Sequence, residues 1–439
     1  MLNHSQTETA MNTSLRASLL LCASLLCLPL ISQANEGVIA FVGARIIDGT
    51  VAAPLEDAVL IVRDGRIQAV GPRADVSIPA QATRIDVSGK TLMPGLINAH
   101  GHVGDVIGLE GGHYTTDNLL RQLSLYARYG ITTVNSLGND AQQGFELRDS
   151  QYRIDLRRAR LYVAGSVVVG DSEAAIRDEV NRNADLGANY IKVRIDDNLG
   201  RTTKMPAHLF QALVDQAHIR RLPVAVHLFY LDDAKFVLEN GADLIAHSVR
   251  DLAVDPEFMD LIKQQDVCYI PTLTREVSTF IYESTPAFFS DPFFLKEVDE
   301  DIITALQSPE RQARLRSSSS AQQYKIALEV AMENIDLLTS NGVKIAMGTD
   351  SGPAGRFQGY FEHMELELMV AAGMSPLQAI RSATGVAADC MNASDIGTLE
   401  PGKWADIVVL DANPAEDILN TRAIDSVWIA GNRVPTGRP

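Results

Sequence analysis

The sequence is poor in cysteine, tryptophan and basic residues. It contains four cysteines and two tryptophans in 439 residues, and 38 Lys and Arg against 55 Asp and Glu, which gives a formal net charge of −17. Because phosphate binding needs a cationic face, this balance excludes a generic nucleic-acid binder. Two cysteines, Cys22 and Cys27, lie near the N-terminus. The other two, Cys268 and Cys390, are too few for a disulfide framework, and whether they pair is left open.

Long hydrophobic runs are also absent, apart from one near the N-terminus. Residues 17–31 follow Arg16 and are mostly apolar, and residues 32–34 (Ser-Gln-Ala) place small residues where a signal peptidase reads the chain. The run has 15 residues and is short for a bilayer span, although an uncleaved anchor is the alternative. We predict a signal peptide over residues 1–34, cleavage after Ala34, and a secreted or periplasmic product without a membrane segment.

What is present is the composition of a folded globular protein, with 46% hydrophobic and 21% charged residues. Residues 35–92 and 393–439 consist of short strand-like segments separated by turn signals. The pair Asp64-Gly65 is one of these, and it predicts a β-hairpin. We expect the two ends of the chain to build one small β-sandwich.

The middle of the chain, residues 93–392, alternates short apolar strands with amphipathic stretches. Eight such units predict a closed parallel (β/α)8 TIM barrel, which is an α/β fold. An open doubly wound sheet is the alternative, but no Gly-x-Gly-x-x-Gly follows a strand to favour it. Residues from about 275 to 340 exceed a normal connection and indicate a helical, charged insertion, interrupted at residues 317–320. The expected strands are 96–99, 132–137, 161–169, 190–193, 224–227, 244–246, 268–271 and 344–347, and helices are expected over 118–129, 173–186, 207–220 and 232–239.

Six side chains capable of binding metal lie in these strands or at their ends: His100, His102, Lys192, His227, His247 and Asp350. Active sites of such barrels lie at the carboxyl ends of the strands, so these six side chains are expected to converge. Imidazole and carboxylate are good ligands for ions such as Zn²⁺, and CO₂ can convert a lysine amine into an anionic carbamate. Each residue by itself is more often structural, and Asp350 by itself could be a helix cap. Together they predict a site for two divalent metal ions, with Zn²⁺ expected.

Three motifs carry a family resemblance. Residues 93–102 (Met-Pro-Gly-Leu-Ile-Asn-Ala-His-Gly-His), residues 348–352 (Gly-Thr-Asp-Ser-Gly) and residues 397–411 resemble signatures of the amidohydrolase superfamily. The likeness is greatest to its imidazolonepropionase-like and metal-dependent dipeptidase (prolidase-like) branch. Asn98 departs from the first signature, where many relatives have Asp. The chain also has Val-Gly-Asp-Ser at residues 169–172, where some dipeptidases of this branch carry a histidine.

The resemblance implies a distorted (β/α)8 barrel with a β-sandwich, and hydrolysis of amides or esters. It implies that His100, His102 and Asp350 hold the more buried ion, that His227 and His247 hold the more exposed one, and that N-carboxylated Lys192 bridges both. A metal-activated hydroxide then attacks the scissile carbonyl, while Asp350 accepts and passes on the proton. The expected activity is cleavage of the C–N bond of a small substrate such as a dipeptide or N-acyl amino acid.

Substrate contacts are assigned to four residues, each with a structural alternative. Arg194 faces inward if its strand is regular and then binds a substrate carboxylate, or else it pairs with Asp196. Tyr230 resembles a family tyrosine that contacts the substrate carbonyl, or else it is a packed aromatic residue. Arg275 and Arg356 either reach the substrate or are solvated loop charges.

Other functions stay open at this point. The same ligands suit deamination of cyclic amidines or ring opening of lactams and lactones, and a degenerate barrel would be a non-catalytic binding protein. The expected partner is a small-molecule substrate, and a homo-oligomer agrees with base rates.

Overall fold

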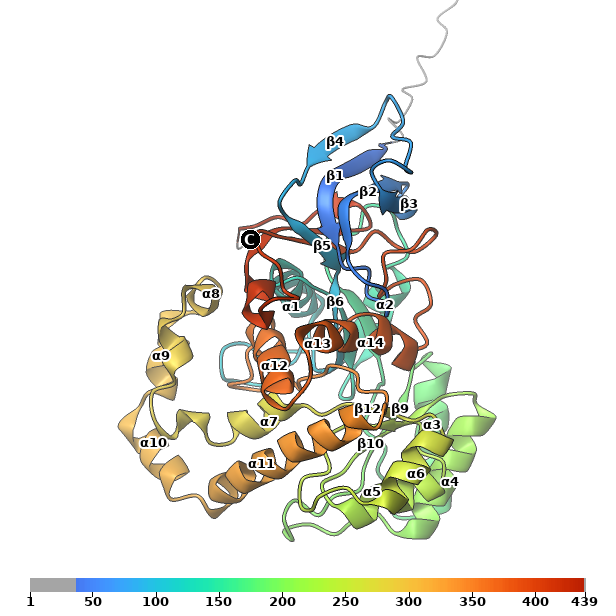
Figure 1. Cartoon of the computed structure of the whole chain (residues 1–439). Helices are drawn as coiled ribbons and strands as arrows, with labels where there is room; N and C mark the ends of the chain where they lie inside the picture. The colour runs from blue at the N-terminus through green and yellow to red at the C-terminus, as the bar shows by residue number, and fades with distance from the viewer. Residues whose placement is uncertain (1–36, 438–439) are drawn as a thin grey trace, which may run out of the picture. The chain divides into compact units, whose positions relative to one another are not determined.

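The computed structural model describes residues 37–437, so the predicted signal peptide lies outside the described residues. The chain folds as an α/β protein in which strands from both ends form one sheet at the top of Figure 1. This eight-stranded sheet has the order β15-β14-β13-β5-β1-β2-β3, and β4 pairs with β1. Its strands are β1 (Ile39–Ile46), β2 (Leu55–Arg63), β3 (Arg66–Pro72), β4 (Thr83–Asp86), β5 (Thr91–Pro94), β13 (Ile407–Leu410), β14 (Ile424–Ile429) and β15 (Asn432–Arg433).

The two ends need each other to bury their apolar faces. β13 pairs antiparallel with β5, and Phe41 and Leu60 pack in one cluster with Ile407 and Val409. The turn predicted at Asp64-Gly65 is confirmed: β2 and β3 form an antiparallel hairpin, and both turn residues have positive φ, as a type I′ turn requires. Backbone pairing joins all eight strands from the two ends of the chain in one hydrogen-bonded sheet. The predicted domain boundaries stay predictions.

Two parallel sheets occupy the middle of the chain. One contains β6 (Leu96–Gly101), β7 (Ile131–Ser136) and β8 (Arg160–Val163), and the other contains β9 (Ile191–Arg194), β10 (Val224–His227), β11 (Leu244–Ile245) and β12 (Cys268–Tyr269). Continuous ladders do not close these sheets into a barrel. Isolated parallel bridges connect Val168 with Val193, Tyr269 with Ile345, and Gly101 with Ser351.

Two predicted strands differ from the observed ones. The segment expected at 161–169 is regular only as far as Val163, because Gly165 adopts a positive φ before Val168 resumes pairing. The segment expected at 344–347 forms no regular strand: it has an isolated bridge between Ile345 and Tyr269, and its Met347 carbonyl accepts from the Ala99 amide at 2.9 Å. The pattern of apolar and polar residues cannot reveal such breaks in a strand, because the apolar residues continue across them.

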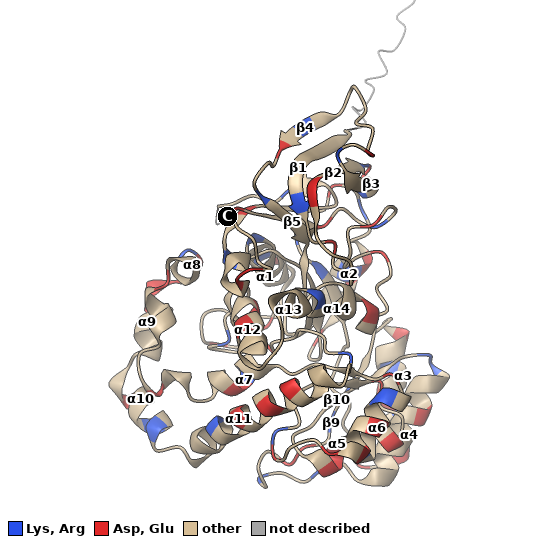
Figure 2. Ribbon diagram, viewed as in Figure 1, with Lys and Arg blue, Asp and Glu red and all other residues tan. Residues whose placement is uncertain are grey.

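Helices follow the strands as the sequence predicts. The four predicted helices are confirmed to within about two residues, and side-chain caps such as Ser172 on the amide of Ala175 begin several of the helices. The helices are α1 (Thr116–Arg128), α2 (Gln142–Asp149), α3 (Glu173–Asp185), α4 (Ala207–Ile219), α5 (Leu231–Glu239), α6 (Pro256–Gln264), α12 (Tyr360–Ala371), α13 (Pro376–Ser382) and α14 (Gly385–Cys390). In Figure 2 the ribbon is coloured for acidic residues along α5 and α6.

The extra segment near residues 275–340 is helical, as predicted. It breaks at the serines because α10 ends at Arg316 and the Ser318 hydroxyl caps the next helix at the Ala321 amide. Its elements are α7 (Leu273–Ser278), the 3₁₀ turns Ile281–Glu283 and Ala287–Ser290, α8 (Pro292–Leu295), α9 (Glu300–Leu306), α10 (Pro309–Arg316) and α11 (Ser319–Ser340). Among residues 37–437 no helix is long and apolar enough to cross a bilayer.

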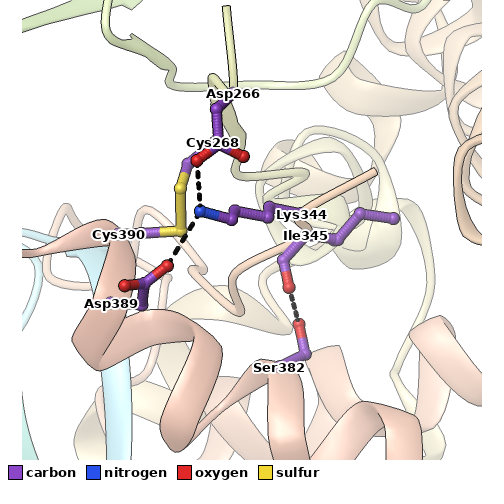
Figure 3. The surroundings of a disulfide bond; sticks show 7 residues. All are labelled: Asp266, Cys268, Lys344, Ile345, Ser382, Asp389 and Cys390. Atoms are coloured by element: carbon purple, nitrogen blue, oxygen red, sulfur yellow. Dashed lines mark hydrogen bonds and ion pairs between the residues drawn. A yellow bond between two sulfur atoms is a disulfide. The ribbon is translucent and has the colours of Figure 1, made fainter. Parts of the chain in front are cut away.

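The two remaining cysteines form a disulfide. Cys268, the first residue of β12, is bonded to Cys390 at the end of α14, 122 residues later (Figure 3). Lys344 lies beside the disulfide and pairs with Asp266 at 2.6 Å and with Asp389 at 3.0 Å. The disulfide therefore lies where the strand segments begin, at the opposite end from their carboxyl termini.

Candidate metal centre

Three of the six predicted metal ligands, called here the first half of the centre, come from the first and the last strand segments of residues 93–392. β6 carries His100 and leads into His102, and Asp350 follows the Ile345 segment. One ligand atom from each of these three residues lies within 4.8 Å of the others. His102 Nε2 is 2.9 Å and His100 Nε2 is 3.9 Å from Asp350 Oδ1. The three predicted ligands of the buried ion are thus brought together.

The second half lies beside it. His227 ends β10 and His247 follows β11, and their ring centroids are 4.1 Å apart. The His247 ring lies 4.6 Å from that of His100, and the Lys192 amine lies 3.4 Å from His100 Nε2. All six predicted ligands therefore form one connected group, in which Lys192 contacts the first half through His100.

Burial sets the charge of these groups. It lowers the pKa of His100 and His247 well below the usual value and that of His227 to about 3. Burial also lowers the pKa of Lys192 to about 7, so that a free amine exists at neutral pH. Burial opposes ionisation of Asp350, but Arg356 and the histidines outweigh it and hold the pKa of that carboxyl well below its ordinary value. His100, His227 and His247 are therefore neutral imidazoles, Asp350 is a carboxylate, and part of Lys192 is a free amine at neutral pH.

These properties fit divalent metal ions. Metal ligands must be unprotonated, and a histidine ligand is normally oriented by a hydrogen bond on its other nitrogen. His247 Nδ1 lies 2.7 Å from Thr272 Oγ1, and His102 Nδ1 lies 3.2 Å from the Gly138 carbonyl. His227 Nε2 lies 2.9 Å from Asp196 Oδ2. One nitrogen of each of these three rings is thus held by a hydrogen bond, and the other nitrogen of His102 faces the Asp350 carboxylate.

Asp196 is a site residue that the sequence analysis treated only as a partner of Arg194. Its side chain is 1% exposed and its second oxygen accepts from Arg194 Nε at 2.7 Å. Burial raises the pKa of this carboxyl, yet His227 and Arg194 together lower it below the ordinary value. Its position at the carboxyl end of the Lys192 strand was the available signal.

The four predicted substrate-contacting residues have different surroundings. Arg194 makes the ion pair with Asp196 that was its structural alternative, and 44% of its side chain is exposed. The Tyr230 hydroxyl donates to Asp197 at 2.9 Å. Arg356 is ion-paired to Asp350 and donates from Nε to Ser278 at 3.0 Å.

Arg275 is buried rather than solvated. It pairs with Glu276 at 2.9 Å and donates to the Tyr324 hydroxyl at 3.2 Å. The alternative of a solvated loop charge is wrong for this residue, because α7 folds under the long helix α11. Of the four, only Arg356 touches a predicted metal ligand through a described ion pair or hydrogen bond.

A cavity of about 370 Å³ opens beside His102. The residues that line this cavity are small and mostly apolar, and its polar groups besides His102 are Asp105 and Asn139. A second cavity of about 130 Å³ shares three lining residues with it and reaches Arg356 and the insertion residue Phe294. The shared residues are Val106, Gly352 and Pro353. This space accommodates a small molecule next to the His102–Asp350 pair.

Comparison with known proteins agrees with this geometry. A sequence model of the amidohydrolase family matches residues 91–434. Ochratoxinase of Aspergillus niger is 24% identical over 462 residues, covering 91% of this chain and 88% of that protein. An imidazolonepropionase of a Bradyrhizobium strain is 24% identical, covering 82% and 89%.

Two solved structures illustrate the shared fold. A putative prolidase from Bifidobacterium longum superposes with a TM-score of 0.74 at 24% identity, over 92% of this chain and 96% of that chain. A Xaa-Pro dipeptidase with bound methionine superposes with a TM-score of 0.71 at 21% identity, over 90% and 99%.

Proposed function

Because the chain belongs to the amidohydrolase family, as its signatures predicted, we propose that it is an exported binuclear metal-dependent hydrolase that cleaves a carbon–nitrogen bond of a small substrate. The observation that carries the proposal is the joint convergence of His100, His102 and Asp350 with Lys192, His227 and His247. Four of the six groups are buried and two are partly exposed, and a non-catalytic protein would have no reason to bring them together.

The ligand roles follow the two halves of the centre. His100, His102 and Asp350 would hold one ion and His227 and His247 the other, and carboxylated Lys192 would be a ligand of both. When bound, two such ions, Zn²⁺ by ligand type, make water nucleophilic near neutral pH and polarise a carbonyl. The lowered pKa of Lys192 supports carboxylation, because only the neutral amine reacts with CO₂.

The chain's own residues then handle the proton. Asp350 is ionised and accepts a proton from the attacking water, and it later delivers that proton to the leaving nitrogen. Arg356 pairs with Asp350 and donates to Ser278, which holds the carboxylate in one orientation. Tyr230, oriented by Asp197, contacts the scissile carbonyl. Arg194, Arg275 and Arg356 are the other proposed substrate contacts, and without substrate they pair with Asp196, Glu276 and Asp350.

Two structural features support the proposed closed barrel and the proposed export. The isolated bridges at Val193, Ile345 and Ser351 connect the parallel sheets in the order that a (β/α)8 barrel requires. The Cys268–Cys390 disulfide supports export after cleavage at Ala34, because disulfides persist mainly in oxidising compartments.

A dipeptide or an N-acyl amino acid is the proposed substrate. The prolidase-like and ochratoxinase relatives support this class, and the cavity beside His102 has room for a small group. Elemental analysis of the purified protein should give about two metal equivalents, and a hydrolysis panel should favour dipeptides or N-acyl amino acids over lactams, lactones and cyclic amidines. Turnover of the cyclic substrates alone would replace this assignment with the ring-opening or deaminating one, and no metal with no turnover would leave a binding protein.

Lys192→Ala tests the bridge. Without the bridging ligand we expect metal content to fall from two equivalents toward one, while Lys235→Ala on α5, which loses only outer ion pairs with Asp255 and Glu257, keeps both. Full occupancy in Lys192→Ala, measured by elemental analysis, would count against a carbamate bridge.

A further inference from the structure

Helix α12 carries two fully buried glutamates one turn apart, Glu362 and Glu365. Neither was a predicted site residue, and neither belongs to the proposed ligand set. A buried carboxyl group needs several hydrogen bonds to offset the loss of water. Both have them: the donors to Glu362 lie beside His100 and Asp350, and the donors to Glu365 directly follow Thr272, which contacts His247.

Glu362 is bonded to both motifs of the first half of the centre. Its Oε1 accepts from Asn98 Nδ2 at 2.6 Å, Thr349 Oγ1 at 2.8 Å and Ser351 Oγ at 2.5 Å, and Oε2 accepts from the Gly359 amide at 2.6 Å. The Asn98 oxygen in turn accepts from the His100 amide at 3.0 Å. The Asn98–Glu362 pair therefore connects the strand that carries His100 with the residues on both sides of Asp350.

Asp350 needs such support because its backbone is left-handed, with φ of 53°. Left-handed conformations are unfavourable for residues other than glycine, and they persist where surrounding contacts hold them. The Asp350 amide donates to the His100 carbonyl at 2.7 Å, and both neighbouring hydroxyls donate to Glu362. This conformation directs the Asp350 carboxylate toward His102.

Glu365 repeats the arrangement in the second half. Its oxygens accept from the Leu273 amide at 2.7 Å and from the Thr274 amide and hydroxyl at 2.7 Å. These residues follow Thr272, a β-branched residue with φ of 53°. Thr272 Oγ1 is the group that orients the His247 ring, at 2.7 Å from Nδ1.

We propose that Glu362 and Glu365 are positioning residues that hold the left-handed residues Asp350 and Thr272, so that one helix aligns the two halves of the metal centre. Glu362 acts with Asn98 on the half formed by His100, His102 and Asp350, and Glu365 acts through Thr272 on His247. This inference rests on the proposed metal centre, and the readouts below are metal binding and spectra rather than activity alone.

The Asn98–Glu362 pair allows a reversal test. Asn98→Asp places two carboxylates against each other, and Glu362→Gln places an amide NH₂ against a hydrogen-bond donor in either orientation. Each single variant should weaken Co²⁺ binding by about 10–100-fold, the range for residues that orient ligands, and should alter the visible absorption of the bound cobalt. The double variant N98D/E362Q restores one amide facing one carboxylate and should recover most of the affinity and the wild-type spectrum.

Glu365→Gln should affect the other half. An amide has one acceptor oxygen for the two backbone donors, Leu273 and Thr274, so Thr272 loses its support and metal content should fall toward one equivalent. Glu367→Gln is the matched control, because Glu367 lies on the same helix and pairs only with Arg422 outside the centre. This control should bind two equivalents with the wild-type spectrum.

The outcomes separate the two proposals. A wild-type protein that binds no Co²⁺ or Zn²⁺ overturns the proposed function itself. If the wild type binds two equivalents and Glu362→Gln and Glu365→Gln bind them with unchanged affinity and spectrum, the positioning role is wrong. The single variants and N98D/E362Q could instead lose Co²⁺ affinity equally and all unfold at lower temperature. That result would show that the Asn98–Glu362 pair is a purely structural contact, and it would also overturn the inference.

Discussion

The two ends of the parallel strand segments contrast with each other, and the difference separates stability from chemistry. At the starts of two of them, Cys268 is bonded to Cys390, and Lys344 pairs with Asp266 and Asp389 (Figure 3). At the ends of the same segments, Thr272 and Asp350 adopt left-handed conformations beside buried histidines. The first end is stabilised by covalent and ionic contacts. The second holds left-handed backbone at Thr272 and Asp350 and buried neutral histidines around the proposed ligand group.

The largest expected effect is at the carboxyl end. Asp350→Asn keeps a side chain that tolerates the left-handed backbone, so the fold and the bound metal should be retained. Loss of the proton acceptor should lower kcat by about 10²–10⁴-fold. Steady-state kinetics with parallel elemental analysis measures both, and wild-type turnover in this variant would reject the role of Asp350.

The disulfide should show the opposite behaviour. Replacing both Cys268 and Cys390 by serine releases a long loop in the unfolded chain and should lower the free energy of unfolding by about 2–5 kcal/mol. Below its unfolding transition the variant should keep the kcat and metal content of the wild type. A drop in kcat without a change in the urea midpoint would remove the contrast between the two ends.

Acid should destabilise the carboxyl end selectively in the metal-free protein. Burial lowers the pKa of His227 to about 3, below the value near 6.5 of an unfolded histidine. The unfolded state therefore binds more protons between these values, and the stability contributed by neutral His227 is full above pH 6.5 and declines as pH falls toward 3.

Urea unfolding of the metal-free protein at several pH values measures this decline. His227→Asn should flatten it, by up to about 1.4 kcal/mol per pH unit. Identical pH slopes for the variant and the wild type would show that His227 is not held neutral.

The smallest effect is expected from Lys344→Met at the opposite end. Its two ion pairs are well exposed to water, so their removal should change the free energy of unfolding by less than about 1 kcal/mol. Activity and metal content should be unchanged. A loss comparable with that of the disulfide variant would show that the ionic contacts, and not the covalent one, stabilise this end.

Much of the proposed metal centre could be predicted from the sequence. Alternate side chains of a strand lie on one face, and parallel strands end at the same edge of a sheet. His100, His102, His227 and His247 follow short apolar runs, and that local pattern was enough to group them. The breaks at Gly165 and in the Ile345 segment were not readable, because backbone conformation changes there without a change in apolar pattern. Asp196 was named, but its contact with His227 depends on the neighbouring strand.

The residue types, their order and their spacing along the chain determined which groups could meet at a metal centre and which family the chain resembles. Only the tertiary structure decided that Cys268 pairs with Cys390, that Arg275 is buried against Glu276, and that Asn98 meets Glu362. Hydrophobic periodicity is a local property. The partner of a buried polar group is instead chosen by how distant segments pack, since each such group must find its hydrogen bonds wherever packing places it.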